Sequence, residues 1–312
     1  MNDSEKETLS CKGNEVLTFI VTSYNYAYYL SSNLESICNQ WSIDNPFNVV
    51  IVDDGSSDRS WEIAESYCKR YDFVELYSHP CHQNLGLIKS LLLAIQKART
   101  DWLVFLESDD ISTPETASTL CSVLKDEPTG LIFFDVEPLL EEGQNEGWFE
   151  SYVPRVRNLM LKLGRDKKGV KLENEILREN LIPTFSCAVV RKDLLEQCSF
   201  NCPVPGWIDW FLWIQVAQKS HVRFIDKKLV RWRIHKGSQN NRKKLWAYLQ
   251  QYSLFRRSIL LRLKKMDIEN KPSKIAFLAL PSTIPLGMRF LKMARYVGIK
   301  RMIKEIYRRL SR

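Results

Sequence analysis

The chain has 312 residues and a mass of 36.6 kDa, enough for one large α/β domain with an appendage or for two modest domains. Its hydrophobic content of 45% argues against a disordered protein. We find no apolar stretch of the roughly 20 residues that span a bilayer, and the polar start MNDSEKETLSCKGNE is not typical of a signal peptide. These features predict a cytoplasmic location.

The net charge of +8 is divided unevenly along the chain. Residues 241–312 contain 19 Lys and Arg against 3 Asp and Glu, a net charge of +16. Residues 1–240 hold the remaining 26 basic and 34 acidic residues, a net charge of −8. The basic character therefore belongs to the tail, and we expect no nucleic-acid partner for the first 240 residues.

The eight cysteines show no spacing typical of a zinc site, since none of them forms a CxxC pair. Without an export signal, reduced cytoplasmic thiols are the simplest interpretation. The sequence also lacks a GxGxxG motif, which argues against a dinucleotide-binding fold of the dehydrogenase type.

Short apolar runs alternate with segments of helical spacing. In chain order, we expect strands at 16–22, 48–52, 73–77, 102–106, 130–136 and 184–190, and a strand or a hairpin at 222–233. We expect helices at 27–41, 59–71, 87–99, 114–126, 172–181, 192–197 and 207–217. Residues 137–170, rich in Gly, Glu and Lys, are expected to be less regular and to form an insertion or a loop on the acceptor side. The alternation predicts an α/β fold with a mostly parallel sheet flanked by helices.

Two of the expected strands end in acidic residues. Asp53 and Asp54 follow the strand at 48–52, and Glu107, Asp109 and Asp110 follow the strand at 102–106. Because parallel sheets bind ligands at the carboxyl ends of their strands, we expect these acids to meet at one edge. Asp109 and Asp110 could form a solvated turn or cap the next helix, or they could hold Mg²⁺ or Mn²⁺, which prefer oxygen ligands.

Four segments taken together resemble a family 2 glycosyltransferase of the bacterial surface-polysaccharide type. They are Val21–Asn25 (VTSYN), Ile51–Asp58 (IVDDGSSD), Asn84–Gly86 (NLG) and Phe105–Asp110 (FLESDD). Their order and spacing match over roughly residues 16–135. The resemblance implies a GT-A fold, which is Rossmann-like, a sugar-nucleotide donor, and Mn²⁺ or Mg²⁺ as the cofactor.

The resemblance also implies roles for residues of this first half. Thr22 and Tyr24 would cradle the base and ribose, and Asp54 would accept a hydrogen bond from the base. Glu107 stands where the family usually has Asp, and Asp109 would be the metal ligand. The expected nucleotide-sugar contacts are Thr22, Tyr24, Asp53, Asp54, Glu107, Ser108 and Asp110.

Three later segments extend the resemblance into the second half. Residues 183–191 (PTFSCAVVR) resemble the acceptor-side strand, and residues 206–217 (GWIDWFLWIQVA) resemble the helix with the catalytic base. The family usually has two acids at the start of this helix; here Ile208 replaces the first and Asp209 keeps the second. Asp209 is the expected base, although it could also cap the helix. In residues 231–238 (RWRIHKGS), His235 would contact the metal or the diphosphate.

The implied reaction is transfer of a sugar, with inversion, from a nucleotide diphosphate to a hydroxyl of a glycan or lipid-linked acceptor. UDP is the preferred nucleotide. Two alternatives remain open. A nucleotidyltransferase would typically have a Gly- and Lys/Arg-rich phosphate loop, which residues 20–30 lack. A degenerate sugar-nucleotide-binding protein without catalysis stays possible because of Ile208 and Glu107.

The tail has the pattern of two basic amphipathic helices, at 242–265 and 289–310. Such helices can lie on an anionic membrane or pack on a folded domain. We expect the membrane, which would place the protein peripherally on its inner face. The expected organisation is a GT-A domain at 1–240, with a nucleotide half at 16–135 and an acceptor half at 136–240, followed by a basic helical tail at 241–312.

Overall fold

The structure, a computed structural model, describes residues 15–142, 149–163, 169–237, 254–255 and 259. The chain divides into two compact units that alternate along the sequence. The first comprises Met1–Leu139, Val156–Phe200 and Asp209–Arg233, and the second comprises Leu140–Arg155, Asn201–Ile208 and Ile234–Arg312. The boundary expected near residue 240 and nearly all of the tail lie outside the described residues.

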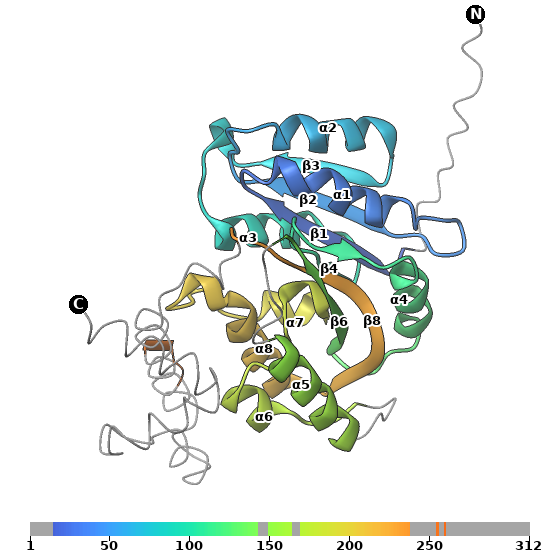
Figure 1. The fold of residues 1–312 in the computed structure, drawn as a ribbon, viewed down its shortest axis with the longest axis vertical. Helices are drawn as coiled ribbons and strands as arrows, with labels where there is room; N and C mark the ends of the chain where they lie inside the picture. The colour runs from blue at the N-terminus through green and yellow to red at the C-terminus, as the bar shows by residue number, and fades with distance from the viewer. Residues whose placement is uncertain (1–14, 143–148, 164–168, 238–253, 256–258, 260–312) are drawn as a thin grey trace, which may run out of the picture. The chain divides into compact units, whose positions relative to one another are not determined.

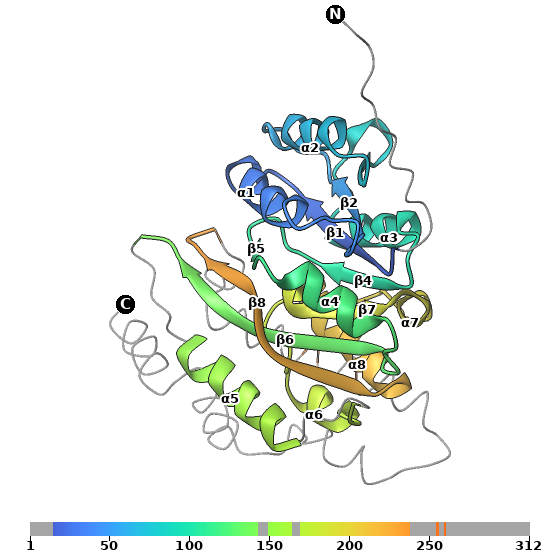
Figure 2. The same ribbon diagram turned by 90° about the vertical axis from the view of Figure 1, so that its right-hand side faces the viewer.

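An eight-stranded sheet forms the centre of the first unit, with strands in the order β3-β2-β1-β4-β7-β6-β8-β5 (Figures 1 and 2). The α/β fold predicted from the sequence is therefore confirmed. The strands are β1 (Leu17–Ser23), β2 (Asn48–Asp53), β3 (Val74–Ser78), β4 (Trp102–Phe105), β5 (Ile111–Ser112), β6 (Leu131–Leu140), β7 (Ala188–Arg191) and β8 (Val222–Ile234).

The first four strands are parallel, and β1 lies between β2 and β4. Helices α1 (Ala27–Cys38) and α2 (Ser60–Arg70) cover one face of these strands, and α3 (Leu87–Lys97) covers the other (Figure 2). Because both faces are covered, β1, β2 and β4 are almost completely buried, which explains their continuous apolar sequences.

The second half of the sheet differs from the parallel arrangement that we expected. Strand β7 is antiparallel to both β4 and β6, and β5 is antiparallel to β8. The short strand β5 was not predicted, because two residues are too few for a period to show. The remaining helices are α4 (Thr116–Leu124), α5 (Phe149–Leu163), α6 (Glu173–Arg178), α7 (Lys192–Glu196) and α8 (Ile208–Lys219), with short 3₁₀ turns η1 (Pro80–His82), η2 (Phe185–Cys187) and η3 (Pro205–Trp207).

The expectation of a less regular insertion or loop at 137–170 was wrong. Strand β6 continues to Leu140, and α5 forms a helix of 15 residues within this segment. The apolar positions Val153, Val156 and Met160 have helical spacing and are buried. Pro154 inside the helix, together with the polar residues around it, concealed this pattern in the sequence.

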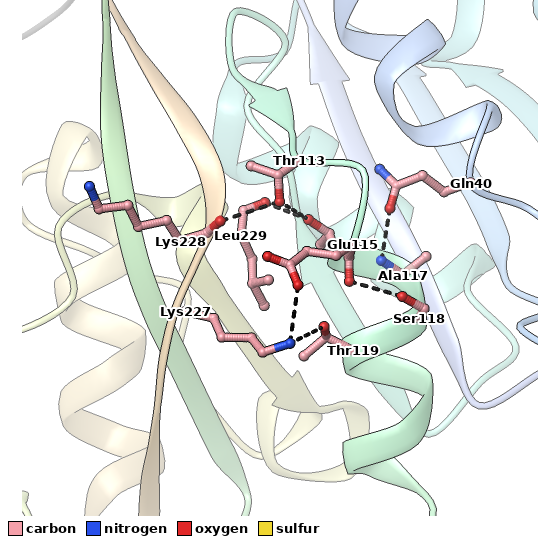
Figure 3. A network of polar contacts seen from close by, with 10 residues as sticks. Gln40, Thr113, Glu115, Ala117, Ser118, Thr119, Lys227, Lys228 and Leu229 are labelled. Carbon is pink, nitrogen blue, oxygen red and sulfur yellow. Dashed lines mark hydrogen bonds and ion pairs between the residues drawn. The ribbon is translucent and has the colours of Figure 1, made fainter.

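A polar network fixes the start of α4, directly after the acidic end of β4 (Figure 3). The backbone N–H of Thr113 and the hydroxyl of Thr116 both donate to the carbonyl oxygen of Leu229 in β8, at 3.0 and 2.5 Å. Gln40, just beyond α1, accepts from the backbone N–H of Ala117 at 2.9 Å. The chain that leaves the acidic loop is thus held to α1 and to β8.

The second unit is described only in part. Its buried Phe255 packs edge-on against the Trp207 ring, with 5.2 Å between ring centroids. The N–H of Glu141 donates to the carbonyl of Ile234 at 3.2 Å. Across the described residues of both units, none of the helices combines the length and the apolar character that crossing a membrane requires.

Candidate active site

The sheet brings the two predicted acidic clusters to one edge. Asp53 lies at the end of β2, opposite Ser23 of β1, and Glu107 follows Leu106 just beyond the end of β4. Since β2 and β4 flank β1 and all three are parallel, Asp53, Asp54 and the loop 107–110 lie at the carboxyl edge. The predicted location of the site is therefore consistent with the sheet topology.

Asp53 and Asp54 are both buried and both hydrogen-bonded to protein groups. Asp53 accepts from the N–H of Ser56 at 2.9 Å and from its hydroxyl at 2.6 Å. Asp54 accepts from the N–H of Leu85 at 2.8 Å and of Gly86 at 2.9 Å. These bonds shape the loop after β2 and hold the start of α3. The predicted contacts of both acids with the donor stay predictions.

The loop after β2 also approaches the loop before α3 closely. Gly55 has a φ of +73°, and a Cβ atom there would lie 2.3 Å from the carbonyl oxygen of His82. A side chain at this position is excluded by both the backbone conformation and the contact. The NLG segment is thereby packed directly against the DDG segment, which explains why they occur together.

Asp58 ties the loop after β2 to the start of α1. It accepts from the N–H of Ala27 at 3.0 Å, and from both the N–H and the hydroxyl of Ser60, at 3.0 and 2.6 Å. Partial burial acts to raise the pKa of Asp58, but these hydrogen bonds outweigh it and hold the pKa below its usual value. Asp58 therefore stabilises the loops around the carboxyl edge.

Thr22 and Tyr24 remain accessible at the end of β1. Thr22 is half-buried, and 46% of Tyr24 is exposed. Thr22 and Tyr24 are thus accessible to a nucleotide, whereas Asp53, Asp54 and Ser108, which were also predicted to contact it, are buried.

The backbone of the acidic loop is held by Asn33 of α1. Its side-chain amide donates to the carbonyl of Glu107 at 2.8 Å and to the carbonyl of Asp110 at 2.7 Å. Asn33 is fully buried, on the same helix face as Leu30, Leu34 and Ile37. A buried amide in this apolar face is explained by the two carbonyl groups that it satisfies.

Asp110 links this loop to the antiparallel half of the sheet. Its carboxylate accepts from the Ser186 hydroxyl at 2.5 Å and from the Arg233 backbone N–H at 2.9 Å. Burial, and then the charges of Asp109 and Glu107, raise its pKa well above the usual value. Asp110 thus connects the acidic loop to η2 and β8. Its predicted contact with the sugar-nucleotide donor stays a prediction.

Glu107 is accessible to solvent, yet its carboxyl group is crowded by protein atoms and by other acids. This desolvation, followed by the charges of Asp109 and Asp209, raises its pKa to about 8. The Thr184 hydroxyl donates to the carboxylate at 2.6 Å and partly offsets the rise. The electrostatic effect of Asp209 also shows that the predicted base and the acidic loop lie near each other.

Asp109 is half-buried, and its carbonyl oxygen accepts from Nε of Arg233 at 2.7 Å. The Arg233 guanidinium lies over the ring of Tyr29, 5.0 Å from its centroid. A cationic group is therefore placed beside the acidic loop, where it offsets part of the negative charge.

Asp209 lies in the first turn of α8 and is half-buried. The side-chain amide of Asn180 donates to Oδ2 of Asp209 at 3.2 Å. Ile208, which replaces the other acid of the family pattern, is buried as a core residue. At the start of α8, Asp209 is therefore partly exposed, whereas its neighbour Ile208 lies in the apolar core.

His235 follows β8 in the second unit and is buried. Its Nδ1 accepts from the N–H of Gly237 at 3.2 Å. A neutral imidazole that accepts at Nδ1 carries its proton on Nε2, which makes Nε2 a hydrogen-bond donor. This tautomer suits a phosphate oxygen better than a cation. The predicted role of His235 stays a prediction.

The acidic loop offers oxygen ligands of the kind that Mg²⁺ and Mn²⁺ prefer. Within the described ranges, no group of three or more His, Cys, Asp or Glu side chains has a metal-binding arrangement. A hard cation is often held by one or two carboxylates, with substrate phosphates and water completing its shell. Burial raises the pKa values of Glu107 and Asp110, and the neighbouring carboxyl groups raise them further, so a cation at this loop would favour the ionised forms of both. The residues present therefore fit a metal that binds together with a phosphate ligand.

Four residues that matter here were missed in the sequence: Asn33, Asn180, Thr184 and Ser186. They act through hydrogen bonds to the acidic loop or to Asp209. Asn33 gave a signal, because a polar residue interrupts the apolar face of a helix. Asn180 lies at the end of the helix expected at 172–181, and Thr184 and Ser186 lie in the segment that resembles the acceptor-side strand, but no pattern marked these three side chains as site residues.

The sequence profile described as "Glycosyl transferase family 2" matches residues 18–199, more than half of the chain. The chain belongs to glycosyl transferase family 2. The matched range includes the acidic loop, residues 107–110, whose sequence resembles this family. The match ends before α8, so it does not include Asp209.

The chain is similar to three further proteins, one by sequence and two by structure. A teichoic acid poly(glycerol phosphate) polymerase of Staphylococcus epidermidis is 37% identical over 98 residues, which cover 30% of this chain and only 13% of the polymerase. The crystal structure of S. aureus TarS 1–349 with UDP-GlcNAc gives a TM-score of 0.63 at 16% identity, covering 90% of this chain and 78% of that one. The mannosyltransferase PcManGT from Pyrobaculum calidifontis, with GDP-Man and Mn²⁺, gives 0.55 at 16% identity, covering 92% and 77%. The structural matches show a shared fold.

The raised pKa of Glu107 predicts a pH-dependent stability. The folded protein binds this proton more tightly than the unfolded chain, so the free energy of unfolding should fall as the pH rises from the ordinary value of 4.5 to about 8. In Glu107→Gln, thermal unfolding should show a smaller fall over this range. Because solvent screens part of the effect, we expect a difference in Tm of about 2–4 °C.

Glu62→Gln, on the exposed side of α2, is the matched control and should keep the wild-type pH dependence. An unchanged fall of Tm with pH in Glu107→Gln would contradict the crowding of carboxylates described above.

Proposed function

We propose that the protein transfers a sugar, with inversion, from a nucleotide diphosphate to an acceptor hydroxyl. The observation that carries the proposal is the electrostatic contact of Asp209 with Glu107 of the acidic loop, in a chain of glycosyl transferase family 2. It supports the assignment of Asp209 as the base for a reaction at the carboxyl edge of the sheet. Carboxylates that would hold a cation for the leaving diphosphate and a carboxylate for the acceptor hydroxyl thus belong to one unit.

In this proposal, Asp209 takes the proton of the acceptor hydroxyl as the general base. The oxygen then attacks the anomeric carbon from the face opposite the leaving diphosphate. A single displacement requires one base in line with the bond that breaks, as in inverting glycoside hydrolysis. Asp209 is half-buried, so part of this residue is exposed to solvent at the start of α8.

Asp109, among the described acids, is the first candidate to hold Mn²⁺ or Mg²⁺. The resemblance implies His235 as a contact of the metal or the diphosphate, and the hydrogen bond that its Nδ1 accepts from Gly237 favours the diphosphate. When bound, the metal would neutralise charge on the leaving diphosphate. Glu107 would face the ribose or the metal's water, while Asp110 and Asn33 hold the loop in place. The Mn²⁺ in the PcManGT complex supports this choice of cofactor.

We propose a UDP-sugar as the donor, supported by the UDP-GlcNAc bound to TarS. Thr22 and the exposed ring of Tyr24 would receive the nucleotide at the end of β1. The acceptor would be a glycan or a lipid-linked glycan, in line with the polysaccharide-related names of relatives such as the teichoic acid polymerase.

The sharpest test of the base is Asp209→Asn in the full chain. The assay follows release of UDP or GDP from a panel of UDP-sugars and GDP-mannose, with Mn²⁺ and with water or a lipid-linked glycan extract as the acceptor. Loss of the base should lower kcat by about 10²–10⁴-fold, with donor binding unchanged. Asp44→Asn, an exposed acid in the connection before β2, is the matched control.

Three other outcomes would contradict parts of the proposal. Near-normal turnover in Asp209→Asn would exclude this residue as the base. Donor binding without turnover in the wild type would indicate a sugar-nucleotide-binding protein, and release of pyrophosphate would indicate a nucleotidyltransferase.

We further propose that the basic tail binds the anionic inner face of the membrane, although it lies outside the described residues. Each basic residue near such a surface contributes about 1 kcal/mol. Arg308→Gln with Arg309→Gln should therefore weaken co-sedimentation with anionic vesicles by about tenfold or more. The matched pair Lys69→Gln and Arg70→Gln, exposed on α2, should have no effect. Equal binding of the two double variants would contradict a role for the tail.

A further inference from the structure

We infer that Asn180 is a positioning residue for Asp209, holding its carboxylate ionised and in one orientation. Asn180 lies between α6 and η2, 29 residues before Asp209 in the sequence. Its amide nitrogen Nδ2 donates to Oδ2 of Asp209 at 3.2 Å. The inference rests on the proposed function, since Asp209 matters there as the general base.

The orientation of the Asn180 amide follows from its second contact. The backbone N–H of Ile182 donates to Oδ1 of Asn180 at 3.2 Å. An N–H group can only donate, so the oxygen of the amide must face Ile182. The NH₂ group is then left to face Asp209. The donor in this pair is thus fixed by the backbone and does not depend on an arbitrary choice of amide rotamer.

The segment that carries Asn180 is anchored on both sides. Leu181 and Ile182 are buried, and Ile176 of α6 is buried as well. The indole N–H of Trp210, next to Asp209, donates to the carbonyl of Ile176 at 2.6 Å. Two hydrogen bonds therefore join this segment to the first turn of α8. The support of Asp209 is built from packed elements, as a well-oriented site requires.

The electrostatic surroundings explain why such a donor is needed. The charge of Asp209 raises the pKa values of the Glu107 carboxyl and the Cys187 thiol, so Glu107 brings a second carboxyl group near Asp209. A nearby carboxylate disfavours ionisation of Asp209, whereas a hydrogen bond donated to its charged form favours it. Asn180 supplies this bond without adding a charge to the site.

Asn180→Asp is the most informative change. The new side chain has the same shape and keeps an oxygen for the Ile182 N–H, but it replaces the donor with a second carboxylate oxygen beside Asp209. The matched control is Asn45→Asp, the same chemical change before β2, at the opposite edge of the parallel strands. Both are made in the full chain, together with Asp209→Asn.

The kinetic readout is UDP release from UDP-glucose, or from the sugar nucleotide that the wild type uses fastest. We expect Asn180→Asp to lower kcat by about 10- to 100-fold, with the donor KM unchanged within about twofold. Asn45→Asp should keep wild-type values. Wild-type kcat in Asn180→Asp, with Asp209→Asn inactive, would overturn the inference and leave the proposed function standing.

A second readout does not depend on turnover. With aspartate labelled by ¹³C at Cγ, the Asp209 signal is identified as the one missing in Asp209→Asn, and its titration is followed by NMR. In Asn180→Asp its midpoint should move to higher pH by about 1 pH unit or more. An unchanged midpoint would overturn the inference. If the wild type turns over none of the donors, the proposed function fails, and this measurement still decides the role of Asn180.

Discussion

The site depends on carboxylates held close together at the end of β4. Glu107, Asp109 and Asp110 follow one buried strand, and Asp209 of α8 acts on the same loop electrostatically. Like charges in such a place destabilise the fold unless donors or cations compensate them. The hydroxyls of Thr184 and Ser186 and the backbone N–H of Arg233 donate to these carboxylates, and Asn33 donates to the backbone carbonyls of the loop. These donor groups lie in α1, in the segment around η2 and in β8. The hydrogen bonds that stabilise the acidic loop therefore also connect the elements around it.

The acids at this edge have two different roles, which depend on the hydrogen-bond donors around each carboxylate. Asp110 is buried and bonded to Ser186 and Arg233, so it connects the two halves of the sheet. Glu107 and Asp109 keep accessible side chains, which suits contact with a ligand. Asp53 and Asp54 resemble Asp110 in this respect, because their carboxylates accept hydrogen bonds that shape the loops after β2 and before α3. Several acids of the family pattern thus have a structural reason to be present, in addition to any contact with the donor.

The sequence predicted the parallel half of the fold well, because β1, β2 and β4 are continuous apolar runs separated by helical periods. It failed where local signals are weak or conflict. Pro154 and its polar neighbours concealed α5, and the two residues of β5 carry no period. For the site, the acidic residues were found because they stand at the ends of apolar strands, in segments that resemble the family. Asn180 and Thr184 were not found, because their role arises from contacts between segments 29 and 77 residues apart.

The central claim is that this crowded acidic edge serves to bind a nucleotide diphosphate together with a divalent cation. The most direct test is calorimetric titration of the full chain with UDP, with and without Mn²⁺, in the wild type and in Asp109→Asn and Asp209→Asn. The account predicts that UDP binds only when Mn²⁺ is present, that Asp109→Asn abolishes this binding, and that Asp209→Asn retains it. Equal UDP binding in all three proteins without a cation would contradict it.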